Sequence, residues 1–308
     1  MYAVMGITGQ VGGAVARTLL TNGKTVRAIV RDPDRARSWK NRGVESAIAD
    51  YRDANALQTA FAGVEGVFVM IPPNFAPEPD FPETRAIVVA IKAALAAAKP
   101  PKVVYLSSIG AQRATGIGLI TALHILEQDL GSLSIPATFL RAGWFMENAL
   151  WDIASARDQG KVFSFLQPLD KPFPLVATAD VGRVAAESLL QTWTGNRYIE
   201  VAGPQRYSPR QIAATFARAL SHPVEAVAVP RDRWAETFVS QGTAADRTAY
   251  RVEMLDAFNS GWIDFGVPGT EHTKGRIPLD AALEALLAHH ERQHLVPLAQ
   301  VLSKYSAK

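Results

Sequence analysis

Residues Tyr2–Leu20 read YAVMGITGQVGGAVARTLL. The first four of them form an apolar run that is long enough for a buried strand and too short for a helix. Gly6, Gly9 and Gly12 follow at the spacing G-x-x-G-x-x-G, and beyond Gly12 the apolar residues recur with the period of a helix. A strand, a glycine turn and a helix in this order predict a dinucleotide-binding fingerprint. The alternative is a glycine turn in an α/β unit that binds no dinucleotide.

The glycine turn is predicted to bind the pyrophosphate of the dinucleotide. Glycines allow the backbone to turn tightly and allow a phosphate to approach it. The unpaired N–H groups at the start of the helix, together with the helix dipole, favour the negative charge. The residues expected to surround the phosphates are Gly6, Thr8, Gly9, Gln10, Val11 and Gly12.

The end of the second predicted strand, Thr25–Val30, indicates which dinucleotide binds. In a parallel βαβ unit this end meets the adenosine ribose, where an acidic residue selects NAD. Here the position holds Arg31, and the planar guanidinium of arginine suits a 2′-phosphate. We therefore expect NADP (NADPH) rather than NAD, whereas Asp32 keeps NAD as an alternative. A second alternative is that Arg31 and Arg35 belong to a solvated helix start.

Two further strand ends contribute predicted cofactor contacts. Asp50 follows the third predicted strand, Val44–Ala49, and would lie near the adenine or else serve as a turn or capping residue. Ile71 and Pro72 end the apolar fourth strand and open a proline-rich segment. That segment leaves the carboxyl edge of the sheet, where open α/β sheets bind ligands, so we expect it to pass over the cofactor. A rigid connector is the alternative.

Strands and helices alternate through the first half of the chain and predict an α/β fold, a doubly wound parallel sheet of Rossmann type. With 308 residues and 48% apolar composition, the chain can bury a large core. The regular alternation ends near Trp144. We therefore expect an NAD(P)-binding domain over residues 1–150 and a smaller α+β substrate lobe over residues 151–308, part of which returns to the main sheet.

Charge and cysteine content exclude several classes of function. The formal net charge is +3 and no run of basic residues with interleaved aromatics occurs, so we expect no nucleic-acid partner. The absence of cysteine rules out disulfides and cysteine-ligated metals and fits a cytoplasmic location. An N-terminus that enters a core strand predicts no signal peptide, and no apolar stretch is long enough to cross a membrane. The sequence does not indicate an oligomeric state.

Six segments resemble the NmrA-like branch of the atypical short-chain dehydrogenases/reductases. They are Gly6–Gly12, Asp50–Tyr51, Ser107–Gly110, Arg141–Asn148, Thr178–Gly182 and Glu253–Ile263. Their order along nearly the whole chain makes the resemblance more specific than the glycine motif alone. It implies an extended Rossmann fold with a small C-terminal substrate lobe. Members of the family include NADPH-dependent quinone reductases, proteins labelled azoreductases and dinucleotide-sensing regulators.

The chain departs from catalytic short-chain dehydrogenases, which place a Tyr-x-x-x-Lys pair on the helix after the fifth strand. His124 and Gln128 align with that pair at the same one-turn spacing. Histidine exchanges protons near neutral pH, so His124 is a candidate proton donor to a reduced quinone; alternatively, it binds the cofactor ribose or packs. Gln128 is expected to hydrogen-bond the cofactor without supplying the lysine charge. Ser107, or its neighbour Ser108, stands where the family's serine orients a substrate carbonyl.

The segment after the last main strand is expected to meet the nicotinamide. Backbone groups near Gly143 would hold the carboxamide, with Trp144 beside it. Trp144, Phe145 and Met146 would wall a site for a flat acceptor, and Glu147 and Asn148 would supply polar contacts. The alternative is that these aromatic residues belong to the core. No metal is expected: the spacing of His290 and His294 permits one, but no catalytic context supports it, so we interpret them as solvated.

These features predict an NADPH-binding oxidoreductase that transfers hydride to a quinone or similar small electrophile, with a small-molecule electron acceptor as its partner. Because the cofactor supplies the hydride, such a reduction requires less from the protein than alcohol oxidation does. The missing Tyr/Lys pair favours a rival from another class, a non-catalytic NAD(P)-binding redox sensor that acts through a protein partner. An isomerase or epimerase is a third alternative, and it would need the absent pair.

Overall fold

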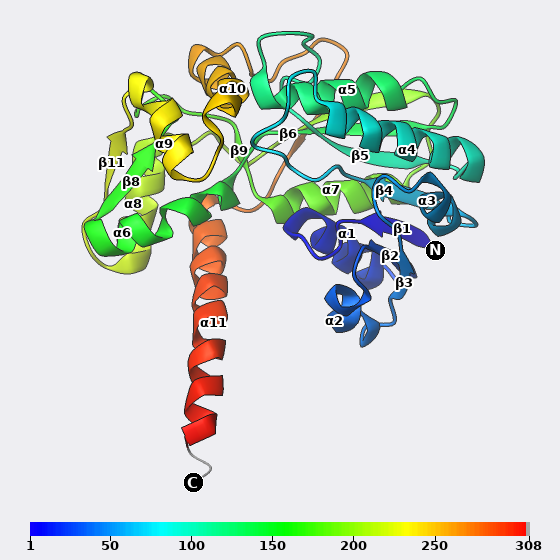
Figure 1. Cartoon of the computed structure of the whole chain (residues 1–308), viewed down its shortest axis with the longest axis horizontal. Coiled ribbons are helices and arrows are strands. Elements are labelled where there is room, and N and C mark those ends of the chain that lie inside the picture. The colour runs from blue at the N-terminus through cyan, green and yellow to red at the C-terminus, as the bar shows by residue number, and fades with distance from the viewer. Residues whose placement is uncertain (306–308) are drawn as a thin grey trace.

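An eight-stranded parallel sheet forms the centre of the molecule in the computed structural model (Figure 1). The structure describes residues 1–305, without the side chains of Pro33 and of residues 293–305. Across the sheet the strands run in the order β3-β2-β1-β4-β5-β6-β10-β12. Their bounds are β1 (Tyr2–Met5), β2 (Val26–Val30), β3 (Glu45–Ile48), β4 (Gly66–Val69), β5 (Val103–Ser108), β6 (Ala137–Ala142), β10 (Asn196–Ala202) and β12 (Glu271–Lys274).

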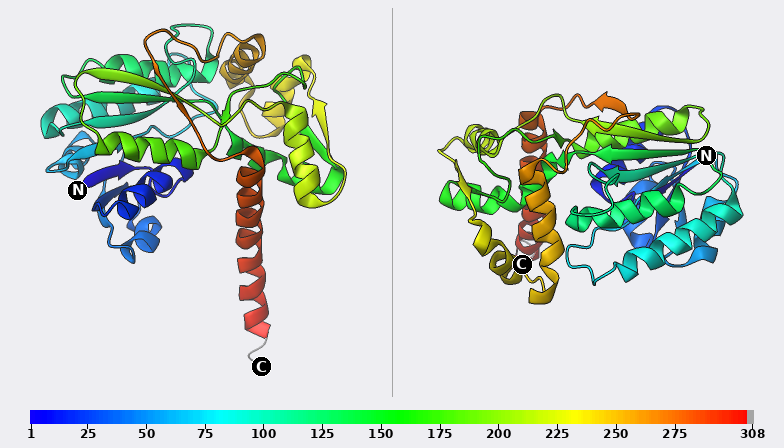
Figure 2. Two further views of the ribbon diagram at one scale, coloured as in Figure 1. Left: turned by 180° about the vertical axis from the view of Figure 1, so that it is seen from behind. Right: turned by 90° about the horizontal axis from the view of Figure 1, so that it is seen from above.

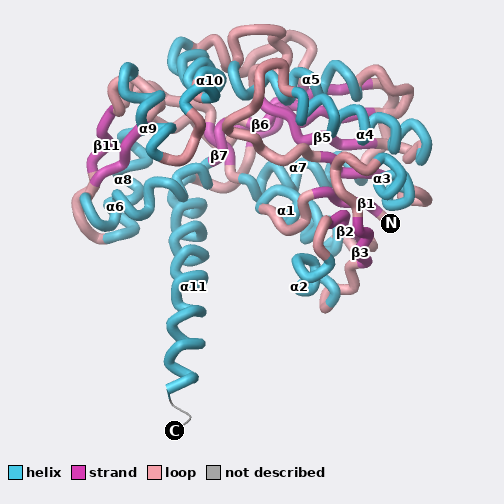
Figure 3. Tube along the Cα trace, viewed as in Figure 1, coloured by secondary structure: helices cyan, strands magenta, loops and turns pink. Residues whose placement is uncertain are grey.

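Helices cover both faces of this sheet, which explains why the inner strands β1 and β4 contain no charged side chain and are wholly buried (Figure 3). The helices are α1 (Gln10–Thr21) and α7 (Thr178–Leu190) on one face, and α3 (Ala54–Phe61), α4 (Pro82–Ala98) and α5 (Thr121–Leu130) on the other, while the short α2 (Arg37–Lys40) follows β2. The side chains of β1 alternate between the two faces. Tyr2 and Val4 belong to the core beneath α1 and α7, and Ala3 and Met5 belong to the core beneath α3, α4 and α5. This arrangement confirms the predicted doubly wound α/β fold of Rossmann type.

Helices α1 and α7 pack closely because Gly182 lies between them. A Cβ atom at Gly182 would stand 2.4 Å from the Ala14 Cβ and 2.7 Å from the Val11 carbonyl oxygen, which is too close for any side chain. Helix α7 therefore runs directly beside the helix that follows the glycine turn. This close approach explains the glycine that ends the segment Thr178–Gly182.

The remaining elements build a second, smaller lobe (Figure 2). They are β7 (Trp144–Phe145), β8 (Lys161–Ser164), β9 (Leu175–Val176), β11 (Glu225–Ala228), α6 (Ile153–Gln159), α8 (Pro209–Leu220), α9 (Trp234–Ser240), α10 (Ala249–Ser260) and α11 (Leu279–Tyr305). Strand β7 pairs with β9, and β8 pairs with β11, both in parallel. The chain leaves this lobe to add β10 and then β12 to the edge of the main sheet. The division of the chain at residue 150 stays a prediction.

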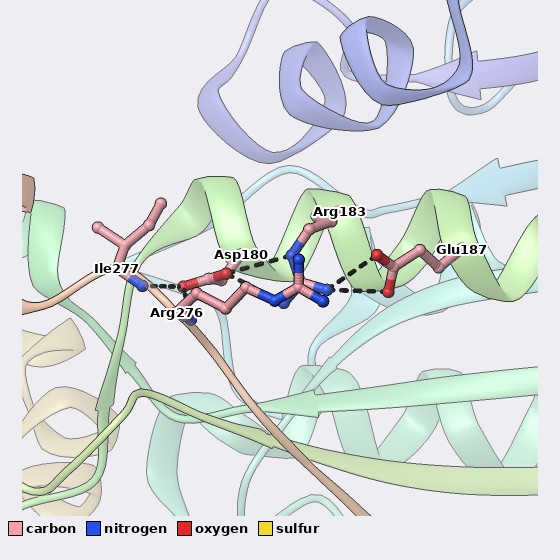
Figure 4. Close-up of polar contacts among 5 residues, drawn as sticks. All are labelled: Asp180, Arg183, Glu187, Arg276 and Ile277. Carbon is pink, nitrogen blue, oxygen red and sulfur yellow. Dashed lines mark hydrogen bonds and ion pairs between the residues drawn. The ribbon is translucent and has the colours of Figure 1, made fainter. Parts of the chain in front are cut away.

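A buried carboxylate fixes the chain where it passes from the main sheet to α11 (Figure 4). Asp180, near the start of α7, accepts hydrogen bonds from the backbone N–H groups of Arg276 and Ile277, each at 2.8 Å. Its other oxygen accepts from the Arg183 guanidinium, which also binds Glu187. The segment between β12 and α11 is thereby tied to the Rossmann helices. No helix in the described part of the chain is long and apolar enough to cross a membrane.

Candidate active site

The glycine turn between β1 and α1 has the geometry of a phosphate cradle. Gly6 has a φ of +66°, which favours glycine, and its carbonyl oxygen accepts from the Gly9 N–H at 2.9 Å. A Cβ at Gly12 would stand 2.3 Å from the Gly6 carbonyl oxygen, so only glycine lets the first turn of α1 pack on the loop. Thr8, Gly9 and Gln10 are exposed, whereas Val11 is buried behind them. The first N–H groups of α1 are thus presented to a ligand.

A cleft of 260 Å³ opens beside this turn, along the carboxyl ends of β1, β2 and β3. Gly6 and Thr8 form one wall, and the segment from Ile29 to Asp32 forms the floor together with Arg35. Ala49 and Tyr51, at the end of β3, complete the lining. The cleft continues the phosphate cradle toward the position where a parallel βαβ unit receives an adenosine ribose.

The cleft is positively charged. Within residues 1–305, neither the Arg31 nor the Arg35 guanidinium forms a hydrogen bond or an ion pair with another side chain, and Arg31 lies over the Tyr51 ring at 5.8 Å. The Asp32 carboxylate instead accepts from the Asp34 backbone N–H at 2.9 Å and caps the short helix that follows β2. Arg31 and Arg35 therefore line the cleft together with Asp32, one of whose carboxylate oxygens already accepts from the turn.

Asp50 lies at the rim of this region, and Tyr51 lines it. The Asp50 carboxylate accepts from the Arg52 backbone N–H at 3.0 Å, and this bond lowers the pKa of Asp50. A contact between Asp50 and the adenine stays a prediction, as do contacts from Ile71 and Pro72. Ile71 is buried in the core beneath α3 and α4, and the neighbouring Met70 packs against the turn, with its sulfur 2.3 Å from where a Cβ of Gly6 would be.

Sequence reasoning missed Tyr51 as a cleft residue and named Arg35 only as an arginine close behind Arg31, without placing it in the cleft. A signal for Tyr51 existed, because it lies two residues beyond the predicted third strand and its ring can cover a flat base. Arg35 carried no such signal. It comes five residues after β2 ends, and the turn of the chain that Asp32 caps brings it to the cleft.

His124 is held by the loop that follows β5. Its Nδ1 lies 2.9 Å from the Ala111 carbonyl oxygen, which can only accept, so Nδ1 carries the hydrogen and Nε2 is the nitrogen left to exchange a proton. His124 is half-buried near the start of α5, and Gln128, one turn later, is exposed. The roles predicted for both residues stay predictions.

Ser107 belongs to a buried polar cluster. Its hydroxyl donates to Glu127 Oε1 at 2.6 Å, and Arg141 donates to the two oxygens of the same carboxylate at 3.0 and 2.6 Å. The guanidinium also lies 4.4 Å from the centre of the Tyr198 ring. A contact from Ser107 to a substrate carbonyl stays a prediction and would require this bond to break. Ser108 is half-buried and donates to the Ile109 carbonyl oxygen.

The structure separates the aromatic residues that follow β6. A Cβ at Gly143 would stand 2.4 Å from the Pro174 carbonyl oxygen, so this position requires glycine. Trp144 packs edge-on against Phe258 of α10, at 5.2 Å, with the core of the second lobe. Phe145 packs instead with the core beneath α1 and α7. Both rings are half-buried, as is Asn148. The contacts predicted for Gly143, Trp144, Phe145 and Asn148 stay predictions.

Comparison with known proteins connects this geometry to a family. The sequence pattern of the NmrA-like family matches residues 2–264. The chain belongs to the NmrA-like family. An NAD(P)H azoreductase of Xenophilus azovorans is 30% identical over 246 residues, which cover 79% of this chain and 82% of that protein. Quinone oxidoreductase 2 of Escherichia coli is 27% identical over 220 residues, 71% of this chain and 74% of that protein.

The solved structures of other proteins agree with this NmrA-like fold. An NADPH-dependent quinone oxidoreductase of Escherichia coli, in complex with NADPH, superposes with a TM-score of 0.75 at 23% identity. The superposition covers 93% of this chain and 100% of that chain. The agreement therefore includes the second lobe as well as the Rossmann sheet.

Three of the segments that carry the NmrA-like resemblance meet beside the glycine turn. The Glu147 carboxylate accepts from the Thr178 backbone N–H at 3.0 Å and from the Thr178 hydroxyl at 2.7 Å. The same hydroxyl lies 3.2 Å from Gln10 Oε1. Burial raises the pKa of Glu147.

Among the described side chains, no cluster of three or more His, Asp or Glu could hold a metal, and the side chain of His294 lies outside them.

Proposed function

We propose that this protein is an NADPH-dependent reductase that transfers hydride to a quinone or a similar small electrophile. The observation that carries the proposal is the cleft beside the glycine turn, which is lined by Arg31 and Arg35, two cations that form no ion pair with any described side chain. The names of the related NAD(P)H azoreductase and quinone oxidoreductase support a small conjugated acceptor. The absence of cysteine supports a cytoplasmic location, which we propose with it.

The preference for NADPH follows from the charges of the cleft. A 2′-phosphate carries negative charge and suits a planar guanidinium, which can bind two of its oxygens at once. Asp32, the residue that would bind the ribose hydroxyls of NAD, already accepts from the Asp34 N–H. The Tyr51 ring and the apolar side chain of Ile29 fit the adenine base. The residues present therefore fit NADPH better than NADH.

When bound, the nicotinamide supplies the hydride, and the reduced acceptor additionally takes one proton. The glycine turn and the start of α1 would hold the pyrophosphate, and backbone groups at Gly143 would orient the nicotinamide end. We assign proton delivery to His124, because its Nδ1 is fixed on Ala111 and its Nε2 could pass on a proton taken from water.

Dissociation constants for NADPH and NADH, measured by isothermal titration calorimetry, test the cofactor assignment. Loss of a charge-assisted bond at a half-open site is worth about 1.4–2.7 kcal/mol, so Arg31→Ala should weaken NADPH about 10- to 100-fold. NADH binding should change less than about threefold, because NADH lacks the phosphate. Arg37→Ala is the matched control, since Arg37 already binds Asp34 at the surface. Equal losses for both dinucleotides would exclude the assignment.

A sensor that binds dinucleotide and signals through a protein partner is the second candidate. The observation that favours it is the exposed Gln128 at the position of the missing lysine. The two candidates differ in turnover. The protein is mixed with NADPH and, in turn, with each of a panel of quinones. If it is a reductase, it oxidises NADPH, and the absorbance of the reduced nicotinamide should decrease. Saturable NADPH binding without oxidation by any acceptor would favour the sensor.

A further inference from the structure

The hydroxyl of Thr178, the first residue of α7, has two oxygen neighbours. It lies 2.7 Å from Glu147 Oε1 and 3.2 Å from Gln10 Oε1. Both Glu147 oxygens also accept from the Thr178 backbone N–H, each at 3.0 Å. Thr178 is buried, Glu147 is half-buried, and Gln10 is exposed as the first residue of α1. The hydroxyl therefore connects a carboxyl group with an amide at the phosphate cradle.

These contacts conflict if Glu147 is ionised, because both neighbouring oxygens then accept and the hydroxyl has a single hydrogen to donate. Two arrangements remove the conflict. In the first, the Gln10 amide is turned over, and its NH2 group donates to Thr178, which donates to the carboxylate. In the second, Glu147 is protonated: it donates to the Thr178 hydroxyl, which donates to Gln10 Oε1. Only the second arrangement keeps the Gln10 oxygen toward Thr178, as in the structure.

A pyrophosphate in the cradle distinguishes the two arrangements. The half of the Gln10 amide that does not contact Thr178 is an oxygen in the first arrangement, and an oxygen repels a phosphate. In the second arrangement it is an NH2 group, which donates to a phosphate oxygen and gains from the charge of that oxygen. The negative pyrophosphate also disfavours a second negative charge close by, so its binding favours the protonated form of Glu147.

The surroundings of Glu147 act in the same direction. Burial raises its pKa, the bonds from Thr178 oppose that shift, and the negative charge of Asp180 on α7 adds to it. Asp180 is itself paired with Arg183, and the remaining partners of the carboxyl group, Thr178 and through it Gln10, are uncharged. The carboxyl group is therefore poised to take up a proton when an anion arrives at the cradle.

We propose that Glu147 and Thr178 are positioning residues for the cofactor: they hold the Gln10 amide with its NH2 group toward the pyrophosphate, while Glu147 carries a proton. Binding of the dinucleotide then moves a proton from solvent to the Glu147 carboxylate. The assignment rests on the dinucleotide site of the proposed function and adds a regulation to it. Affinity falls as pH rises, because the bound state holds the additional proton.

Isothermal titration calorimetry with NADPH, in two buffers that differ in their heat of ionisation, counts the protons taken up on binding. The wild type should take up about half a proton to one proton more than Glu147→Gln at the pH of greatest uptake, between about pH 6 and about pH 9. Its dissociation constant should rise about three- to tenfold per pH unit there. In Glu147→Gln the amide NH2 takes the place of the proton, so tight binding should persist and lose this dependence. NADH should show the same difference, since it lacks the 2′-phosphate and that group's own titration.

Thr178→Ser and Thr178→Val are the matched pair at the connecting hydroxyl. Serine keeps the hydroxyl and should keep the proton uptake, whereas valine should abolish the uptake and weaken NADPH binding about five- to tenfold. Equal uptake in the wild type and in Glu147→Gln would overturn the assignment, as would a serine variant that behaves like the valine variant.

The binding measurement is independent of turnover. Proton-linked binding without oxidation of NADPH by any quinone would leave the positioning role standing and remove the reductase function. Turnover of a quinone with no linkage to Glu147 would do the reverse, and a protein that binds neither dinucleotide would overturn both.

Discussion

Replacing Asp180 with asparagine tests how the chain is tied together where it enters α11, because this change removes the charge and keeps the shape. The Asp180 carboxylate receives the N–H groups of Arg276 and Ile277 through one oxygen and the Arg183 guanidinium through the other (Figure 4). Asparagine keeps an oxygen for the two backbone groups. Its NH2 group then faces the Arg183 guanidinium, so a donor meets a donor.

The magnitude follows from these contacts. Hydrogen bonds to a charged acceptor are about twice as strong as bonds to a neutral one, so each backbone bond weakens by about 1 kcal/mol. Loss of the Arg183 contact adds about 1 kcal/mol, because that side chain is 19% exposed and keeps its bonds to Glu187. The free energy of unfolding should therefore fall by about 3 kcal/mol in Asp180→Asn.

Urea unfolding, followed by far-ultraviolet circular dichroism, measures this change. Glu187→Gln is the matched control, because it removes the other partner of Arg183. The Glu187 carboxylate is 44% exposed, so its loss should lower the free energy of unfolding by only about 0.5 kcal/mol. If Asp180→Asn lost no more than this control, the carboxylate would not be what holds residues 276 and 277, and the reasoning would be refuted.

Two further predictions concern proton exchange. Burial raises the pKa of Asp152 to about 7, above that of the unfolded chain, so the folded state keeps a proton that the unfolded state releases. Stability should fall as pH rises from about 4 to about 7, and the gain from Asp152→Asn in thermal melts should grow over that range; a gain independent of pH would contradict this. His124→Asn, whose amide can still donate to Ala111, should lower kcat for a quinone about 100-fold while the dissociation constant of NADPH stays within threefold. Unchanged kcat would remove His124 from proton delivery.

The fold class and the family were predictable from the sequence because both depend on local patterns. The run from Tyr2 to Gly12 contains its own strand, turn and helix start, so spacing alone identifies the unit. A residue that directly follows a predicted strand lies at the carboxyl edge of the sheet, and this rule placed Arg31 beside the turn. The alternation of such units then requires a parallel sheet covered on both faces.

Tertiary structure alone decided which of these side chains are available to a ligand. Asp32 and Arg31 are neighbours in the sequence, but the turn that follows β2 engages the first and leaves the second unpaired. Ser107 fits a family position, yet its hydroxyl donates to Glu127 of α5. The same carboxylate also binds Arg141 of β6.

Spacing in the sequence also does not reveal contacts between segments that are far apart in the chain. Thr178 meets a residue of the glycine turn that is 168 positions earlier, and Trp262 covers Arg113 from the other lobe. Local patterns determine backbone conformation because they act within one strand or one helical turn. Hydrogen-bond partners and burial depend on which elements pack together, and only the folded chain makes that choice.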